Sequence, residues 1–140
     1  MLRKDYIMRQ FEEFGKVMAV ILGLKKQNDL EKFEEEVANA SQKFTTLNIN
    51  YVEGLSFDVF EKEVLQSPTL LPDQQKMLAD LLYEKMLFYL EKNENTKAFD
   101  IKNKCSALYT VFSENLTANE FNLDVHYKLE FFKTLNINVG

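Results

Sequence analysis

The sequence predicts an all-α protein, built as an antiparallel array of about six helices. Apolar residues recur at intervals of three and four along most of the chain, which is the period of a helix with one buried face. Two long segments of this kind, residues 73–93 and 97–115, follow one another with only a short polar turn between them. No segment shows the alternation of a half-buried strand. The 140 residues are therefore expected to form a single helical domain, residues 1–140.

The first helix is expected at residues 5–24. Its apolar stripe alternates steps of three and four and consists of Ile7, Phe11, Phe14, Met18 and Ile21. After Lys16 the helix is apolar all round, so this half is expected either at the centre of the core or against a second subunit. The apolar run at residues 17–24 is far shorter than the roughly 20 residues that span a bilayer, so no membrane insertion is predicted.

The next two helices are set by capping residues and prolines. Asn28 or Asp29 is expected to cap the second helix, which ends near residue 47. A third, shorter helix is expected to begin at Ser56. Two prolines then interrupt the pattern at residues 67–72, because the residue before each proline avoids helical angles. This segment is a weak internal boundary, since both halves are too small to fold alone.

The fourth and fifth helices are expected to form an αα-hairpin of the tetratricopeptide-like kind. Pro72 suits the first turn of the fourth helix, where its missing N–H has no helical partner to lose. Ala98 and Cys105 are small residues on the apolar stripe of the fifth helix, so the two axes are expected to approach closely. Such a hairpin is a scaffold for contacts and contributes no chemistry by itself.

The sixth helix is expected to begin at a capping box formed by Thr117 and Glu120. Its apolar stripe consists of Phe121, Val125, Leu129, Phe132 and Leu135. The second and sixth helices end in matching heptapeptides, FTTLNIN and FKTLNIN. Both fit a helix ending with a left-handed residue, which is predicted at Asn48 and Asn136.

Composition excludes some classes of function. The formal charge of −5 argues against a general nucleic-acid binder, which needs a basic field to displace counterions from phosphates. The single Cys105 forms no disulfide within the chain, so a reducing interior is the simplest setting. We therefore expect a cytoplasmic protein that binds no nucleic acid.

Several segments together resemble a known family. They are KDYIMRQF at 4–11, LGLKK at 22–26, LLYEK at 81–85 and YLEKNENTKA at 89–98. They are similar to a family of small, uncharacterised, all-helical bacterial proteins with a tetratricopeptide-like hairpin. The resemblance implies a bacterial, all-helical protein, and it brings no activity or functional residue. The hairpin departs from the usual repeat at Lys85 and Met86, where a Leu-Gly pair is common, and only one repeat is recognisable.

The residues that most often carry chemistry have structural interpretations here. His126 has no nearby cysteine and no acidic residue placed to orient it, so it is interpreted as a surface residue rather than a catalytic base or metal ligand. Cys105 falls on an apolar stripe and is interpreted as a small buried side chain rather than a nucleophile. The densest carboxylate run is interpreted as a solvated helix face and comprises Glu31, Glu34, Glu35 and Glu36. No catalytic residue, cofactor or metal site is predicted.

Two aromatic residues lie off the main stripe of the sixth helix. Tyr127 and Phe131 are one helical turn apart. Together with Tyr83 or Phe88 they are expected to form an exposed aromatic surface for a partner, since aromatic anchors dominate interface energetics. The alternative is a second buried face beneath the N-terminal helix.

The function that the sequence favours is a non-catalytic protein–protein interaction or adaptor module. It is expected to present an apolar helix face to a partner, which is an unidentified protein or a second copy of the chain. One alternative is a pocket for a small apolar ligand or lipid between the first, fourth and sixth helices, lined by Ile21, Met86 and Phe132. Another is a purely structural homo-oligomer. An enzyme is not expected, because no set of polar groups suggests one.

Overall fold

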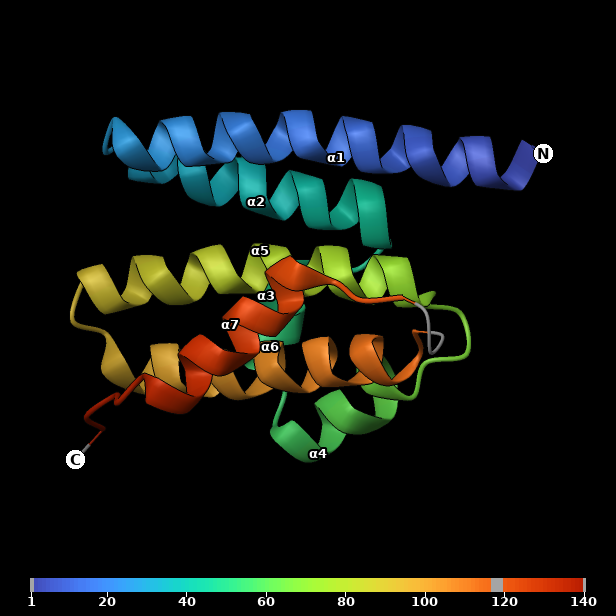
Figure 1. Cartoon of the computed structure of the whole chain (residues 1–140). Coiled ribbons are helices and arrows are strands. Elements are labelled where there is room, and N and C mark those ends of the chain that lie inside the picture. The colour runs from blue at the N-terminus through green and yellow to red at the C-terminus, as the bar shows by residue number, and fades with distance from the viewer. Residues whose placement is uncertain (1, 117–119, 140) are drawn as a thin grey trace.

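A computed structural model describes residues 2–116 and 120–139, and every regular element in these two ranges is helical. The elements are α1 (Leu2–Lys26), α2 (Leu30–Thr45), α3 (Ile49–Gly54), α4 (Phe57–Phe60), the π-helical turn η1 (Glu61–Leu65), α5 (Pro72–Glu91), α6 (Asn95–Glu114) and α7 (Leu123–Thr134). The pair α1 and α2 lies above the hairpin α5 and α6, and α7 crosses the front of the hairpin (Figure 1). The all-α class predicted from the periodicity is confirmed for the described residues.

The connection between α1 and α2 follows the predicted capping. Asn28 adopts a left-handed conformation with φ of 60°, which turns the chain at the end of α1. The Asp29 side chain then caps α2 by accepting a hydrogen bond from the Lys32 N–H at 3.4 Å. Phe14 of α1 meets Phe44 of α2 edge to face, with ring centroids 5.2 Å apart. The two helices therefore share an aromatic contact close to the middle of α1.

The apolar C-terminal half of α1 does not lie at the centre of the core. Ile21 is fully buried, but its neighbours Val20 and Leu22 remain 53% and 47% exposed. The expectation of a central position is wrong because α1 is an outer helix, covered by α2 and α5 on one side only (Figure 1). Apolar side chains on the other sides of α1 are exposed to solvent.

The end of α2 differs from the prediction. The left-handed residue is Thr46, with φ of 61°, two positions before Asn48. Asn48 has φ of −82° and instead caps a further short helix, α3, by accepting from the Asn50 N–H at 2.9 Å. This helix was missed because its six residues are too few to show a period, although its Ile49 is fully buried. Asn136 is also not left-handed, so both predicted positions are wrong.

The hairpin forms as predicted, with antiparallel helices (Figure 1). Pro72 is the first residue of α5, and the turn to α6 contains the left-handed Asn93 with φ of 60°. The expected close approach is confirmed: the Cys105 thiol of α6 donates to the Ala79 carbonyl of α5 at 3.2 Å, and Ala98 is fully buried. Small side chains therefore let the two backbones meet.

A hydrogen bond and apolar contacts connect the residues before segment 67–72 with the residues after it. Ser56 caps α4 as predicted, with its hydroxyl accepting from the Val59 N–H at 3.3 Å. Beyond the prolines, the Gln75 side chain donates to the Leu65 carbonyl at 3.2 Å. One cluster of buried apolar side chains includes residues from before and after this segment. The core of the described residues is thus continuous across it.

Candidate interaction surface

The helix that carries the predicted surface begins later than expected. Thr117 of the predicted capping box lies outside the described residues, and Glu120 and Phe121 are not helical. The cap is Asn122, whose side chain accepts from the Val125 N–H at 3.0 Å. Val125 then faces inward and is fully buried. Because α7 starts at Leu123, the assignment of Phe121 to its buried stripe is wrong: this ring is 70% exposed.

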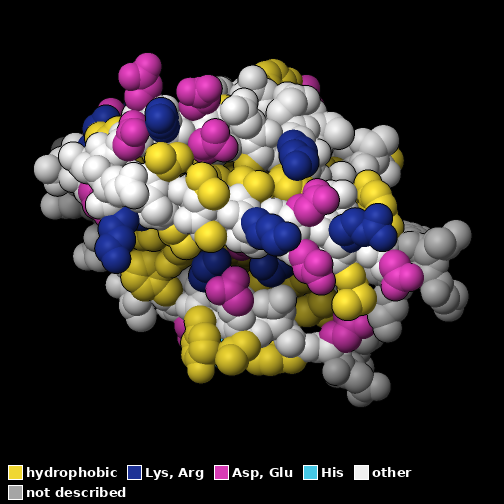
Figure 2. All heavy atoms as spheres, turned by 90° about the horizontal axis from the view of Figure 1, so that it is seen from above, with side chains coloured by type: hydrophobic (Ala, Val, Ile, Leu, Met, Phe, Trp, Pro, Cys, Tyr) yellow, Lys and Arg dark blue, Asp and Glu magenta, His cyan; other side chains and the backbone are white. Residues whose placement is uncertain are grey.

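The outer face of α7 exposes a row of apolar side chains one helical turn apart. Leu123, Tyr127 and Phe131 are 54%, 63% and 37% exposed. Hydrophobic side chains gather over α7 at the lower edge of the view from above (Figure 2). The alternative of a second buried face beneath α1 does not hold for these positions, because α7 crosses the front of the hairpin (Figure 1) and these side chains stay exposed.

The structure brings Tyr83 next to this row. Its ring centroid is 6.4 Å from that of Phe131 and 5.9 Å from that of Phe132. The Lys128 ammonium lies 4.7 Å above the Tyr83 ring, at a distance that allows a cation–π interaction. Tyr83 is half-buried. It contacts the row through Phe131 and is less exposed than the residues of the row.

Phe88 does not belong to the surface. It is almost fully buried on α5 and stacks on Phe33 of α2, with centroids 5.0 Å apart and an angle of 21° between the planes. It also meets Tyr89 edge to face at 5.6 Å. The prediction of Phe88 as an alternative to Tyr83 is wrong because α2 covers this side of α5, which periodicity alone does not reveal.

Sequence reasoning missed two members of the surface. Leu123 shares the four-residue spacing of Tyr127 and Phe131, and that spacing is a signal that was available in the sequence. Phe121 precedes the helix, and its ring centroid lies 5.3 Å from that of His126. Its exposure depends on where α7 begins, which the sequence placed too early. We call Phe121, Leu123, Tyr127 and Phe131 the α7 row.

A buried ionic network holds α7 against the hairpin. The Asp80 carboxylate of α5 accepts a hydrogen bond from the Tyr109 hydroxyl and pairs with Lys76 at 2.9 Å and Lys128 at 3.4 Å. Lys128 also pairs with Asp124 at 3.1 Å. Burial lowers the pKa of Lys128, but the two carboxylates outweigh it and the net shift is upward. The α7 row is therefore displayed on an anchored helix.

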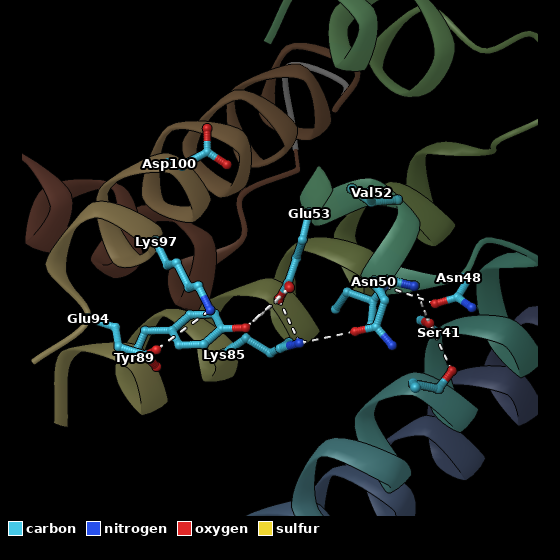
Figure 3. A network of polar contacts seen from close by, with 12 residues as sticks. Ser41, Asn48, Asn50, Val52, Glu53, Lys85, Tyr89, Glu94, Lys97 and Asp100 are labelled. Carbon is cyan, nitrogen blue, oxygen red and sulfur yellow. Dashed lines mark hydrogen bonds and ion pairs between the residues drawn. The ribbon is translucent and has the colours of Figure 1, made fainter. Parts of the chain in front are cut away.

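A second polar network lies at the junction of α3, α5 and α6 (Figure 3). Glu53 pairs with Lys85 at 2.6 Å and accepts a hydrogen bond from the Tyr89 hydroxyl at 3.2 Å. Burial and the Glu53 charge raise the pKa of Tyr89 well above its ordinary value of 10.0. Beside them is an open pocket of about 260 Å³, lined in part by Lys97 and Asp100.

The charged groups around this pocket are paired with one another. Lys104 is completely buried, and its ammonium donates to the carbonyls of Val52, Glu53 and Leu55 at 3.1, 2.9 and 2.7 Å. It also pairs with Asp100 at 3.0 Å. These bonds satisfy the carbonyls of Glu53 and Leu55 at the end of α3 and give a second donor to that of Val52, which also accepts from the Leu55 N–H at 3.3 Å. The network therefore has a structural explanation.

The remaining candidate residues lie apart. His126 is exposed on α7 and lies beside the Tyr127 ring, with centroids 5.8 Å apart. Cys105 is fully buried, and burial raises the pKa of its thiol well above 9.0, which makes it a poor nucleophile. Among the described residues no three or more His, Cys, Asp or Glu side chains are placed to hold a metal ion.

The predicted pocket for a small apolar ligand has no enclosed hollow at the residues that were expected to line it. Ile21 and Met86 are fully buried, and neither lines any of the four hollows described in this structure. Phe132 lines an open hollow between α6 and α7, not an enclosed one. A different hollow, of about 180 Å³, lies between the N-terminal half of α1 and the start of α5. It is smaller than the roughly 300 Å³ of typical ligand pockets.

Comparisons with known proteins do not assign the chain to a class, so its class is described from its structure. No protein-family model, curated protein or solved structure matches the chain. Among the described residues, no helix has the length and apolar character that crossing a membrane requires. The fold and the site thus define a helical protein that exposes an apolar helix face.

Proposed function

We propose that this chain is a non-catalytic protein–protein interaction module and that the α7 row receives its partner. The observation that carries the proposal is the spacing and exposure of Leu123, Tyr127 and Phe131, which form one apolar line along an anchored helix. Scattered apolar residues are normal on a protein surface, whereas a contiguous line rimmed by charged groups is typical of an interaction site. Asp124 and Glu130 provide such a rim.

The energetics of the row support binding. Fully burying one large apolar side chain contributes about 1.5–3 kcal/mol, and aromatic residues are the commonest anchors of interfaces. Lys128 fixes α7 through Asp80 and Asp124. Because the helix is ordered before binding, little conformational entropy is lost when the partner docks.

The partner that fits the row is an amphipathic helix of another protein. A row with four-residue spacing packs against apolar residues at positions i, i+3 and i+7 of a second helix. The binding mode is therefore helix against helix, with the aromatic rings of Tyr127 and Phe131 entering the partner's apolar stripe. The other parts of the molecule act as the scaffold.

We further infer that the scaffold is tetratricopeptide-like and that the protein is bacterial and cytoplasmic. The hairpin of α5 and α6, two helices of 20 residues each, supports the first inference. The resemblance of the N-terminal segment and of the hairpin to a bacterial helical family supports the second. The free, buried Cys105 agrees with a reducing compartment.

The test is affinity capture of partners by the tagged full chain, compared with a Tyr127→Ala/Phe131→Ala variant. We expect a protein that copurifies in near-equal amounts with the wild type and that is reduced about tenfold or more with the variant. The captured protein is then purified and titrated by calorimetry. Chemical cross-links between it and Lys128 or Lys133, which flank the row, locate the contact.

The matched control is Tyr51→Ala/Phe99→Ala. It also removes one tyrosine and one phenylalanine, and these side chains are 53% and 40% exposed on α3 and α6. The control is expected to bind like the wild type. Equal loss of binding in both variants, or cross-links that avoid α7, would contradict the proposal. Circular dichroism of each variant shows that the fold is retained.

A further inference from the structure

A second apolar face lies on the outer side of α1. Its residues recur in steps of three and four, the pattern of a helix–helix seam, and they are Met8, Phe11, Gly15, Met18 and Leu22. We call these five residues the α1 seam. It lies about a quarter turn around the helix from the buried Phe14 and Ile21. Met8, Phe11 and Leu22 are exposed, and Met18 is half-buried.

The position of α1 leaves this seam uncovered. The N-terminal turns of α1 extend beyond the end of α2 (Figure 1), and hydrophobic side chains appear among charged ones when the molecule is viewed from above, over α1 (Figure 2). The exposed parts of Met8, Phe11 and Leu22 do not stabilise the fold of one chain, since this apolar surface stays in water. A face of this kind is explained when another helix packs along it.

The charges beside the seam favour a second copy of the same chain. Asp5 and Glu12 follow one edge of the seam in the N-terminal half of α1, whereas Lys16 and Lys26 follow the same edge in the C-terminal half. All four are exposed, and the structure records no ion pair for any of them among the described residues. Exposed Arg9 lies on the same side of the helix as Lys16, so the N-terminal half of this edge carries two acidic and one basic side chain, and the C-terminal half two basic ones. The two ends of the edge therefore differ in net charge, which favours a reversed partner.

We propose that two copies of this chain pair antiparallel through the α1 seam. A two-fold axis near Gly15 places Asp5 opposite the partner's Lys26 and Glu12 opposite the partner's Lys16. The same symmetry places Met8 opposite the partner's Leu22. In a parallel two-fold pair this edge would face the opposite edge of the partner helix, so these charges meet their complements only in the antiparallel arrangement.

The glycine at the centre of the seam agrees with this arrangement. A Cβ atom at Gly15 would meet no atom within 4 Å, so packing inside one chain does not require glycine there. In the middle of a helix, glycine costs about 1 kcal/mol relative to alanine. Where two helices cross, however, a residue without a side chain lets the backbones approach closely. Gly15 lies where the symmetry brings the two copies of α1 together.

The dimer is independent of the proposed function. The α1 seam and the α7 row lie on different sides of the hairpin (Figure 1), so a dimer leaves two copies of the α7 row accessible. Such a dimer would bind a bivalent partner more tightly than one chain does. Dimerisation is measured on the purified chain alone, so failure of one proposal is distinguishable from failure of the other.

The first experiment measures the mass of the full chain by sedimentation from micromolar to millimolar concentration. The wild type is expected to approach twice the 16.4 kDa of one chain. Leu22→Glu places a carboxylate in the seam and is expected to weaken dimerisation about tenfold or more. Val20→Glu is the matched control, because Val20 is similarly exposed on α1 but lies on the side away from the seam. A monomeric wild type, or equal weakening by both variants, overturns the proposal.

The second experiment tests the direction of the pair by disulfide cross-linking under mild air oxidation. A chain with both Met8→Cys and Leu22→Cys is expected to form covalent dimers, because residue 8 of one copy faces residue 22 of the other. The single variant Met8→Cys is expected to remain uncross-linked, and the buried Cys105 contributes no background. Efficient cross-linking of Met8→Cys alone would show a parallel pair and overturn the antiparallel arrangement.

Discussion

Lys104 is a charged residue that the fold uses in place of an apolar one. Burying an ammonium group is unfavourable unless its donors are satisfied. Here three of its contacts are carbonyls at the end of the short helix α3, and of these three only that of Val52 also accepts a backbone N–H, from Leu55. The positive charge also lies at the C-terminal, negative end of the α3 dipole, where a cation is stabilising. Lys104 therefore fixes α3 against α6, and with it one wall of the polar pocket.

Replacing Lys104 with methionine is expected to destabilise the protein. Methionine keeps the volume of the side chain but leaves the carbonyls of Glu53 and Leu55 without a donor, at a cost of about 3 kcal/mol in the free energy of unfolding. Urea unfolding followed by circular dichroism measures the change. The control is Lys97→Met, two turns earlier on α6, where the exposed pair with Glu94 contributes under about 1 kcal/mol. Equal effects of the two changes would contradict this account of Lys104.

At the scale of the elements, the ends of the helices decide where the chain turns. Asn28, Thr46 and Asn93 are left-handed, and each follows a helix. Asparagine adopts this conformation readily, but a β-branched residue does so at a cost. Thr46 is held there because the chain must turn into α3, whose Ile49 is fully buried. The tertiary contact of α3 therefore outweighs the local preference of threonine.

Glycine at position 46 is expected to stabilise the protein. Thr46→Gly removes the steric cost of the left-handed conformation, so the free energy of unfolding should rise by up to about 1 kcal/mol. Thr134→Gly, at the end of α7, is the comparison, because that residue is not left-handed and glycine there should be neutral or destabilising. Thermal and urea unfolding of both variants show whether each substitution raises or lowers the free energy of unfolding. A loss of stability in Thr46→Gly would contradict the proposed strain.

At the scale of the whole molecule, the α5–α6 hairpin separates two polar networks and two apolar faces. Asp80 anchors α7 on one side, and Glu53 with Lys85 and Lys104 joins α3 to the hairpin on another. The α1 seam and the α7 row remain outside. The buried phenol and thiol groups at the centre of this arrangement make the free energy of unfolding depend on pH.

Stability is expected to fall at alkaline pH. Burial raises the pKa of Cys105 above 9.0 and that of Tyr109 above 10.0, so the folded chain keeps protons that the unfolded chain loses. Their contribution is complete below those ordinary values and is lost as the pH rises toward the raised ones. The free energy of unfolding should therefore fall above pH 9, by up to about 1.4 kcal/mol per pH unit for each group.

Urea unfolding between neutral pH and pH 11 measures this dependence. Tyr109→Phe removes one of the two groups, so its stability should fall less steeply than that of the wild type above pH 10. The Asp80 carboxylate keeps Lys76 and Lys128 as partners in this variant. Identical slopes in the two proteins would show that Tyr109 does not contribute to the alkaline loss.

Periodicity and capping residues by themselves determined the long helices of this protein, but not α3 or the start of α7. Steps of three and four depend only on local geometry, and the caps at Asp29 and Ser56 depend on hydrogen bonds to nearby backbone groups. The hairpin follows from the same signals, with small Cys105 where the helices approach. Tyr127 and Phe131 were identified from spacing alone, and they are exposed as that spacing suggested.

Only the tertiary structure decided which apolar faces are covered. Phe88 and Phe131 both lie off the main stripe of a helix, yet α2 buries the first, whereas the second packs only partly on Tyr83 and stays 37% exposed. The exposed seam of α1 and the buried charge of Lys104 likewise depend on elements distant in sequence. The physical reason is that burial is a property of the neighbours of a side chain, whereas the helical period is a property of the backbone alone.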